Sequence, residues 1–498
     1  MQKILAHKWL LFSLLIAIFA GRMLLTDHHF YVHDDIQVFR VNEFINCFKE
    51  GQIPCRWSNN LGKGYGMPWF NFYPPMIYLI PAMIHQTGLS IIASLNLLMF
   101  LSFILAAWGM YCLVKALTMR EDVAYLGSIL FTLYPFHATN VFLRGVYAEN
   151  LAWSLAPWIL YYLYRQAKSG IFEKVLPWLF ALIFLTHVIS SFLIIGSALV
   201  FVSLINFKSI KLVLGQIFLA ICFSAFFLIP ALVEKNLVQS TSLIEGYYSY
   251  LNHFVTLKQL FINYTWNYGS SYWDTPSVEM GYMVGHIHLI LLSVLSLITI
   301  IYYRHSEKLK LIIAMIGIFI FTIFLTHNQS APIWRMVSNL SYIQFPWRFI
   351  GWAGIPLVLS LSLMLSLLTS RSRQIIIILT TIALLFYSYP FFFPREYDGY
   401  QDADFISGQF KLEQQSKALF DYLPLTVPQI PTEPYGIFYF PGWTSSIKLE
   451  VDNQTGLIVN PPRDLAWHET PFRLAMDLVS LSSLLAYLMY NKAYGKKG

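Results

Sequence analysis

Long apolar runs alternate with short polar connections along nearly the whole chain. A transmembrane helix needs roughly 20 consecutive, mainly apolar residues, and the pattern predicts about twelve such helices in an all-α polytopic membrane protein. A shorter run at 72–85 begins with Pro74-Pro75 and is expected to be re-entrant or interfacial. The predicted spans are 9–25, 90–114, 123–140, 150–164, 175–188, 189–207, 212–232, 281–303, 311–326, 350–369, 375–391 and 473–490.

The basic residues orient these spans, because Lys and Arg are enriched in cytoplasmic connections. With the N-terminus inside and each run crossing once, both termini are cytoplasmic and the protein is a multi-pass cell-membrane protein. Counting 72–85 as a span would invert every later connection. The inside connections then hold 17 of the 33 basic residues: Lys3, Lys8, Lys115, Arg120, Arg165, Lys168, Lys174, Lys208, Lys211, Arg304, Lys308, Lys310, Arg371, Arg373, Lys492, Lys496 and Lys497.

The acidic residues gather on the opposite, extracytoplasmic face. Only Glu121, Asp122, Glu173 and Glu307 fall inside, so the other 22 of 26 carboxylates lie outside or at the outer interface. The groups capable of chemistry are therefore concentrated on one face. Its substantial loops are 26–89, 233–280, 327–349 and 392–472.

The chain divides into a transmembrane unit at 1–391, a small extracytoplasmic domain at 392–472, and a final helix with a cytoplasmic tail at 473–498. The small domain is expected to be mostly β. Its strand-like stretches are Tyr435–Phe440 and Ile447–Val451, followed by a turn at Asp452-Asn453.

Composition agrees with a lipid environment. The chain is 57% hydrophobic and 12% charged, whereas soluble proteins carry about 25% charged residues. The net charge of +7 is accounted for by the cytoplasmic connections, so no nucleic-acid partner is expected. Cys47 and Cys55 lie eight positions apart in the first outer loop, and both a disulfide and two free thiols remain open.

The first outer loop carries the most suggestive pattern, His33-Asp34-Asp35 followed by a helix expected to end near Glu50. An apolar stripe, formed by Ile36, Phe39, Phe44, Ile45 and Phe48, would let this helix lie flat on the outer leaflet. Two interpretations of the acids remain open. They cap the helix, or they act as a general base and as ligands for a divalent Mg²⁺ or Mn²⁺ ion, with His33 tuning either role.

Other outer charged residues also allow two interpretations. Arg144 and Glu149 either form an ion pair that fixes a short loop, or hold a lipid phosphate and a sugar. Arg348 is either an interfacial arginine beside a tryptophan or a second phosphate ligand, and Arg56 with Trp57 is a third. His137, His187, His286, His288 and His327 are interfacial polar groups or ligands of phosphate or metal, and His187 is kept as a substrate-binding candidate.

Two further features of the outer face are open in the same way. The glycines at 62, 64 and 66 form either a flexible turn or a phosphate nest. The aromatic residues of the 233–280 loop, which include Tyr247, Tyr248, Tyr268 and Trp273, belong to an interfacial belt or to a sugar-stacking surface.

Ordered motifs along the chain resemble the membrane proteins labelled pyruvoyl-tetrahydropterin-synthase-related. Nothing in the sequence looks like a soluble pterin enzyme. The matching motifs are His33-Asp34-Asp35, Gly51 to Trp57, Gly64 to Gly66, Asn71 to Pro75, Arg144 to Glu149, Thr186-His187, Pro230 to Glu234, Gln344 to Arg348, Asp421 to Pro424 and Phe440 to Trp443.

That family is similar in plan to the C-type glycosyltransferases, which use polyprenyl-phosphate sugars and place an acidic motif in the first outer loop. The resemblance implies transfer of a sugar from a polyprenyl-phosphate donor to an extracytoplasmic glycan, lipid or protein acceptor. It makes Asp34 the base, Asp35 a helper or metal ligand, and Arg144 or Arg348 the phosphate clamp. The alternatives are a transporter or flippase of lipid-linked glycans and a non-catalytic envelope-assembly protein.

Overall fold

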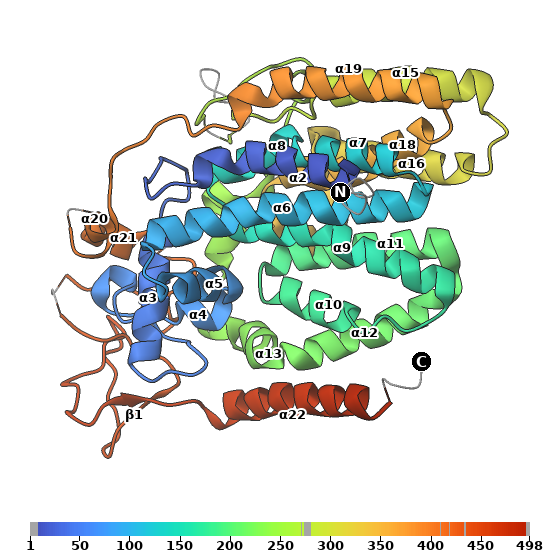
Figure 1. Ribbon diagram of the computed structural model, residues 1–498. Coiled ribbons are helices and arrows are strands. Elements are labelled where there is room, and N and C mark those ends of the chain that lie inside the picture. The colour runs from blue at the N-terminus through green and yellow to red at the C-terminus, as the bar shows by residue number, and fades with distance from the viewer. Residues whose placement is uncertain are drawn as a thin grey trace.

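A computed structural model of the chain describes residues 8–269, 271–272, 280–408, 410–417, 419–432 and 435–494. Lys3, Trp273, Lys496 and Lys497, which entered the sequence analysis, lie outside the described residues. Long helices run alongside one another and form a bundle, with shorter elements gathered at one end (Figure 1).

Each predicted apolar run overlaps at least one helix of the bundle. Among the described residues, five helices are long and apolar enough to cross a membrane, or up to seven if each of two bent pairs is one span. The protein is therefore mostly helical with several candidate spans, and the count of about twelve stays a prediction. The long elements are α2 (Lys8–Gly21), α6 (Ile91–Thr118), α7 (Glu121–Thr132), α9 (Tyr147–Ser169), α10 (Leu176–Phe184), α11 (Val188–Asn206), α12 (Ile210–Phe223), α13 (Ala225–Val233), α15 (His286–Tyr302), α16 (Leu309–Phe324), α18 (Phe349–Leu365), α19 (Ser370–Ser388) and α22 (Pro471–Tyr494).

The centre of the bundle is formed by α6, α7, α9 and α18. α6 packs against α2, α7 and α9, and every residue of α18 is buried. Two glycines of α18 permit this close packing, since a Cβ at Gly351 would meet the Phe136 ring at 2.8 Å and one at Gly354 would meet Tyr134 at 3.0 Å. Such small residues let neighbouring helices approach within a membrane.

The short elements gather at the end of the bundle that the first loop occupies, at the left in Figure 1. The run at 72–85 begins at the last residue of α4 and forms the ten-residue α5, which is shorter than a span. The short helices are α3 (Gln37–Lys49), α4 (Trp69–Phe72), α5 (Met76–His85), α8 (Pro135–Ala138), α14 (Leu257–Phe261), α17 (Ala331–Met336), α20 (Asp402–Ile406) and α21 (Lys411–Ser416).

The helix predicted after Asp35 forms as α3 and crosses the direction of α6 (Figure 1). The expectation that its apolar stripe rests on the leaflet is wrong. Ile36, Phe39 and Phe44 are at most 2% exposed and belong to the main protein core, because α5, α6 and α20 pack around the helix. Helix capping by the two acids is also absent: the N-cap is Ile36, and no side chain caps it.

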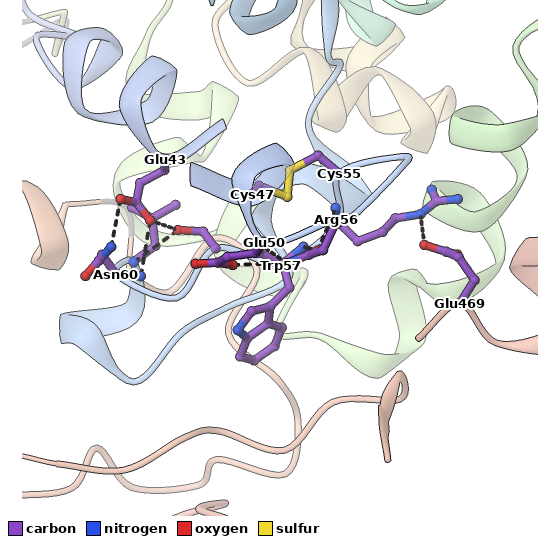
Figure 2. The surroundings of a disulfide bond; sticks show 11 residues. Glu43, Cys47, Glu50, Cys55, Arg56, Trp57, Asn60 and Glu469 are labelled. Atoms are coloured by element: carbon purple, nitrogen blue, oxygen red, sulfur yellow. Dashed lines mark hydrogen bonds and ion pairs between the residues drawn. A yellow bond between two sulfur atoms is a disulfide. The ribbon is translucent and has the colours of Figure 1, made fainter. Parts of the chain in front are cut away.

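A disulfide joins Cys47 of α3 to Cys55, which confirms one of the two alternatives for these cysteines (Figure 2). Beside it, the Glu43 carboxylate accepts hydrogen bonds from Ser58 Oγ at 2.6 Å and from Asn60 Nδ2 at 2.9 Å. A crosslink reduces the conformational freedom of the unfolded chain. The disulfide and the buried carboxylate together fix the turn that follows α3.

The C-terminal segment contains a small sheet, but at other residues than the predicted strands, and its described part is not mostly β. Strand β1 (Trp443–Thr444) pairs antiparallel with β2 (Ala466–Trp467). The stretches predicted as strands make only isolated bridges, such as Phe438 with Leu457, and a turn follows Asp452. The segment is held by aromatic packing instead: Phe440, Trp443 and Trp467 surround Trp57 of the first loop.

Buried ion pairs connect this segment and α22 to the first loop. Arg473 Nε lies 3.0 Å from both oxygens of Glu234, and Asn71 Nδ2 donates to the same carboxylate at 2.7 Å. Arg56 pairs with Glu469 and with Asp477 of α22, each at 3.1 Å; Figure 2 shows its contact with Glu469. These contacts set the position of the outer elements relative to the bundle.

We expect Glu234→Gln to lower stability by about 3–5 kcal/mol, the usual effect of removing one member of a buried pair. Arg473 is fully buried, so its charge would lose its partner without gaining water. Thermal unfolding of the purified protein in detergent measures the loss. Glu413→Gln is the matched control, because that carboxylate is 58% exposed in its pair with Lys417. An equal loss in both variants would contradict the structural role of Glu234.

The orientation can be tested by labelling exposed positions at opposite ends. In a variant without Cys112 and Cys222, a cysteine at Lys448 should react with a membrane-impermeant maleimide in intact cells. A cysteine at Arg371 should react only after permeabilisation. Both native side chains are exposed, so burial would not explain a difference. Labelling of both positions from the same side would refute the predicted orientation.

Candidate functional site

A cavity of about 1200 Å³ opens at the end of the bundle where the first loop and the 233–280 loop lie. Its walls come from the first loop, α9, α11, α13, the 233–280 loop and the segment before α18. Of the candidate residues drawn from the sequence, the cavity brings together His33, Asp34, Arg144, Glu149, His187 and Arg348.

Backbone pairing places the acidic motif beside Arg144. The backbone N–H groups of His33 and Asp34 donate to the carbonyls of Leu143 and Arg144, each at 2.9 Å. Residues Thr139–Arg144 form a π-helical turn, an element often associated with functional sites. Gly145 follows with φ +68°, and a Cβ there would lie 2.5 Å from the Val32 side chain. Only glycine permits this close approach.

Glu149 holds two arginines in the cavity wall. Arg144 Nη1 and Nη2 donate to the two Glu149 oxygens at 3.1 and 3.0 Å, and Arg348 Nε lies 3.2 Å from Oε2. The ion pair proposed for Arg144 and Glu149 is therefore present. Arg348 is buried and also donates to the Ile343 carbonyl at 2.7 Å, so it does not extend to the interface as a snorkelling arginine would.

The two histidines of the cavity have defined partners. His33 Nε2 lies 3.0 Å from the Tyr268 carbonyl; a carbonyl can only accept, so this nitrogen carries the proton. His187 is the N-cap of α11, where its Nδ1 accepts from the Ser190 backbone N–H at 3.2 Å. Its ring is thereby fixed at the helix end that borders the cavity.

Asp34 is the acid of the first loop that enters the cavity. One of its oxygens accepts from Gln37 Nε2 at 2.7 Å. Burial raises the pKa of Asp34, and the positive charge of Arg40 opposes that rise. A carboxyl whose pKa lies above its usual value is a stronger base when ionised, which suits proton abstraction.

Comparison with known families now adds to this geometry. The family model described as "6-pyruvoyl-tetrahydropterin synthase related domain; membrane protein" matches residues 70–394. The chain belongs to this family. The match contains Arg144, Glu149, His187 and Arg348, whereas His33, Asp34 and the C-terminal segment lie outside it. It therefore covers less of the chain than the sequence motifs suggested. No curated protein matches the chain.

Three of the site residues that the sequence suggested do not line the cavity. Asp35 forms a 2.5 Å ion pair with Lys417. Arg56 and Trp57 are at most 1% exposed and are engaged by the C-terminal segment and α22. A role in substrate binding is unsupported for them, because their polar and aromatic surfaces already contact protein.

The metal prediction for Asp34 and Asp35 does not fit the residues present. Among the described residues, no group of three or more His, Cys, Asp or Glu side chains could hold a metal ion. Asp35 forms an ion pair with Lys417. The charge that acts most strongly on Asp34 is the positive charge of Arg40. We therefore derive no chemical step through a metal.

The remaining residues that the sequence suggested either lie outside the cavity or line it as uncharged side chains. His137, His286, His288 and His327 are outside the cavity lining, and the glycines at 62, 64 and 66 form a turn with positive φ. Tyr247, Tyr248 and Tyr268 do line the cavity, as a sugar-stacking surface would require.

Sequence reasoning missed three charged cavity residues, Arg40, Lys235 and Asp421. Arg40 stands on the helix that was expected to lie flat on the leaflet, and no motif in the sequence marked it. Asp421 stood in a quoted family motif, Asp421 to Pro424, but no feature of the sequence placed it near the first loop. The aromatic side chains Trp69, Tyr73 and Tyr422 complete this part of the wall.

Asp421 makes stability depend on pH. Burial raises its pKa to about 6, opposed by the charge of Arg40 and reinforced by that of Asp34. The folded state therefore holds a proton that the unfolded chain releases near pH 4 (about 3.9 for a free Asp). Stability is fully present below that pH and falls as pH rises through about 6.

We expect Asp421→Asn to reduce the fall in unfolding temperature between these two pH values. The fall should not vanish, since the raised pKa of Asp34 acts in the same direction. Thermal unfolding in detergent across this pH range gives the slope. Asp27→Asn, at a carboxylate that is 70% exposed, should leave the slope unchanged. An unaltered slope in Asp421→Asn would contradict the prediction.

Proposed function

We propose that this protein is a membrane glycosyltransferase that moves a sugar from a polyprenyl-phosphate carrier to an extracytoplasmic acceptor. The acceptor would be a cell-envelope glycan, a glycolipid or a protein. The proposed active face is extracytoplasmic, with both termini in the cytoplasm. The plan of C-type glycosyltransferases, with an acid in the first outer loop, supports this assignment.

The observation that carries the proposal is a cavity with both polar groups and lipid-facing side chains in its wall. Phe192 of α11 and Leu232 of α13 line the cavity and are 59% and 46% exposed. α11 belongs to a candidate membrane span, so its exposed apolar side chains would face lipid. A substrate with a polyprenyl chain and a polar head needs both environments at one site.

Asp34 is the proposed general base. The acceptor hydroxyl oxygen would attack the anomeric carbon and transfer its proton to Asp34. The bond from that carbon to the phosphate oxygen would break, and the polyprenyl phosphate would leave with its electron pair. Desolvation of the carboxylate favours this role because it strengthens the base. The Glu149 cluster would shape the wall beside the sugar.

Two alternatives remain from the sequence, a transporter of lipid-linked glycans and a non-catalytic assembly protein. A transporter is expected to carry ionisable residues near the middle of its spans. Here the buried Arg144, Glu149 and Arg348 border a cavity at the outer helix ends. No specific contact favours either alternative over the enzyme.

Asp34→Asn tests the proposal directly. The substitution preserves volume and removes the basic charge, so we expect turnover to fall by about two or more orders of magnitude. Turnover is measured as release of polyprenyl phosphate from a polyprenyl-phosphate hexose by the reconstituted protein, with an acceptor present. Unfolding temperature and chromatographic profile should remain near those of the wild type.

Asp35→Asn is the matched control, one position along and outside the main cavity. It should retain turnover within about threefold, since loss of a partly exposed ion pair has a small effect. Wild-type turnover in Asp34→Asn would reject Asp34 as the base. Equal loss in both variants would show that the charge of the loop, rather than a base in the cavity, is what matters.

A further inference from the structure

Arg40 is a buried cation without an ion-pair partner. The residue is 4% exposed and lines the cavity. Its guanidinium lies over the Trp69 ring, 3.7 Å from the centroid, and 5.7 Å from that of Tyr73. Within the described part of the chain, its Nε has no hydrogen-bond partner and no carboxylate lies within ion-pair distance.

The other two arginines of the cavity are already engaged. Arg144 donates to both oxygens of Glu149 and to Asn140 Oδ1. Arg348 contacts Glu149 and donates to the Ile343 carbonyl and the Gln344 side chain. Both guanidinium groups are therefore paired with Glu149 and held against the wall, whereas Arg40 has no ion-pair partner among the described residues, so the structure favours Arg40 over both arginines that the sequence suggested as phosphate ligands.

An unpaired charge in the protein interior is costly and is retained where it serves a ligand. Asp34 and Asp421 influence Arg40 electrostatically and Tyr78 shares a hydrogen bond with it, but none of these described residues forms an ion pair with it. A planar guanidinium held against an indole presents its N–H groups in a fixed direction. This geometry matches the oxygen atoms of a phosphate group.

The position of Arg40 also connects the anion site to the lipid-facing wall. Trp69 belongs to α4, which packs against α13. Leu228, Ala231 and Leu232 of α13 line the same cavity. A ligand with its phosphate at Arg40 can therefore place an apolar chain along α13 towards the exposed Leu232 side chain.

We propose that Arg40 binds the phosphate group of a lipid-linked phosphate, with the apolar chain of the ligand along α13. The inference deepens the proposed function, on which the identity of the lipid as the sugar carrier rests. Trp69 acts as the platform that holds the guanidinium. Glu149 keeps Arg144 and Arg348 in the wall, where they add positive charge at a greater distance from the phosphate.

Binding of a short prenyl monophosphate to the purified protein in detergent tests this site without requiring turnover. Arg40→Gln should weaken binding by about 10- to 100-fold, the usual effect of losing charge-assisted hydrogen bonds. Arg40→Lys should restore part of the affinity, because it keeps the charge without the planar fork. Arg335→Gln, at an exposed arginine outside the cavity, should bind as the wild type does.

A second measurement uses the unaltered protein, so that a folding defect of the variants cannot decide the result. A prenyl monophosphate that carries a photoreactive group on its apolar chain is cross-linked to the protein, and peptide mass spectrometry identifies the labelled positions. Labelling is expected on α13, where Leu228, Ala231 and Leu232 line the cavity. Unlabelled prenyl monophosphate should suppress this labelling. Inorganic phosphate is the second competitor, and equal suppression by it at the same concentration would assign the site to free phosphate and reject the lipid.

Unchanged prenyl phosphate affinity in Arg40→Gln, or no cross-linking to α13 in the wild type, would overturn the proposal. These outcomes are distinguishable from failure of the proposed function. If the protein binds prenyl phosphate through Arg40 but releases none from a sugar donor, the anion site stands and the transferase assignment fails. If turnover depends on Asp34 while Arg40→Gln binds prenyl phosphate normally, the transferase assignment stands and the phosphate site at Arg40 fails.

Discussion

A charge buried at the end of an apolar bundle is costly without a partner, and the Glu149 carboxylate is the group on which the site depends. It lies between Arg144, delivered by a π-helical turn, and Arg348, which precedes the buried α18. Three separate segments are thereby fixed at one point. Removing the carboxylate would leave two buried cations facing each other, so the cluster determines the shape of the cavity as well as its charge.

Backbone hydrogen bonds join the first outer loop to this cluster. Hydrogen bonds from His33 and Asp34 reach the carbonyls beside Arg144, and Gly145 leaves room for Val32. Asp34 consequently enters the cavity, whereas Asp35, one position later, turns towards Lys417. Adjacent acids in a sequence can thus have different environments, because the backbone direction changes at the start of α3.

A second set of buried contacts lies away from the cavity and has a structural role. Arg56 and Trp57 looked like ligands for phosphate and sugar because of their residue types. In the folded chain they hold the C-terminal segment and α22, as do Glu234 and Arg473. Buried arginines at an interface satisfy carboxylates from distant segments as readily as they satisfy a phosphate, and sequence patterns do not separate the two uses.

Apolar run length is a local property, so the sequence alone determined the helical class and the approximate helix positions, whereas the strands of the C-terminal sheet formed at other residues than predicted. Family motifs added six residues that share the cavity. Only tertiary structure decided that α3 is buried, that Asp35, Arg56 and Trp57 lie outside the cavity, and that Arg40 and Asp421 lie within it. These facts depend on contacts between segments hundreds of residues apart, and hydrophobic periodicity does not report which apolar face meets lipid and which meets protein.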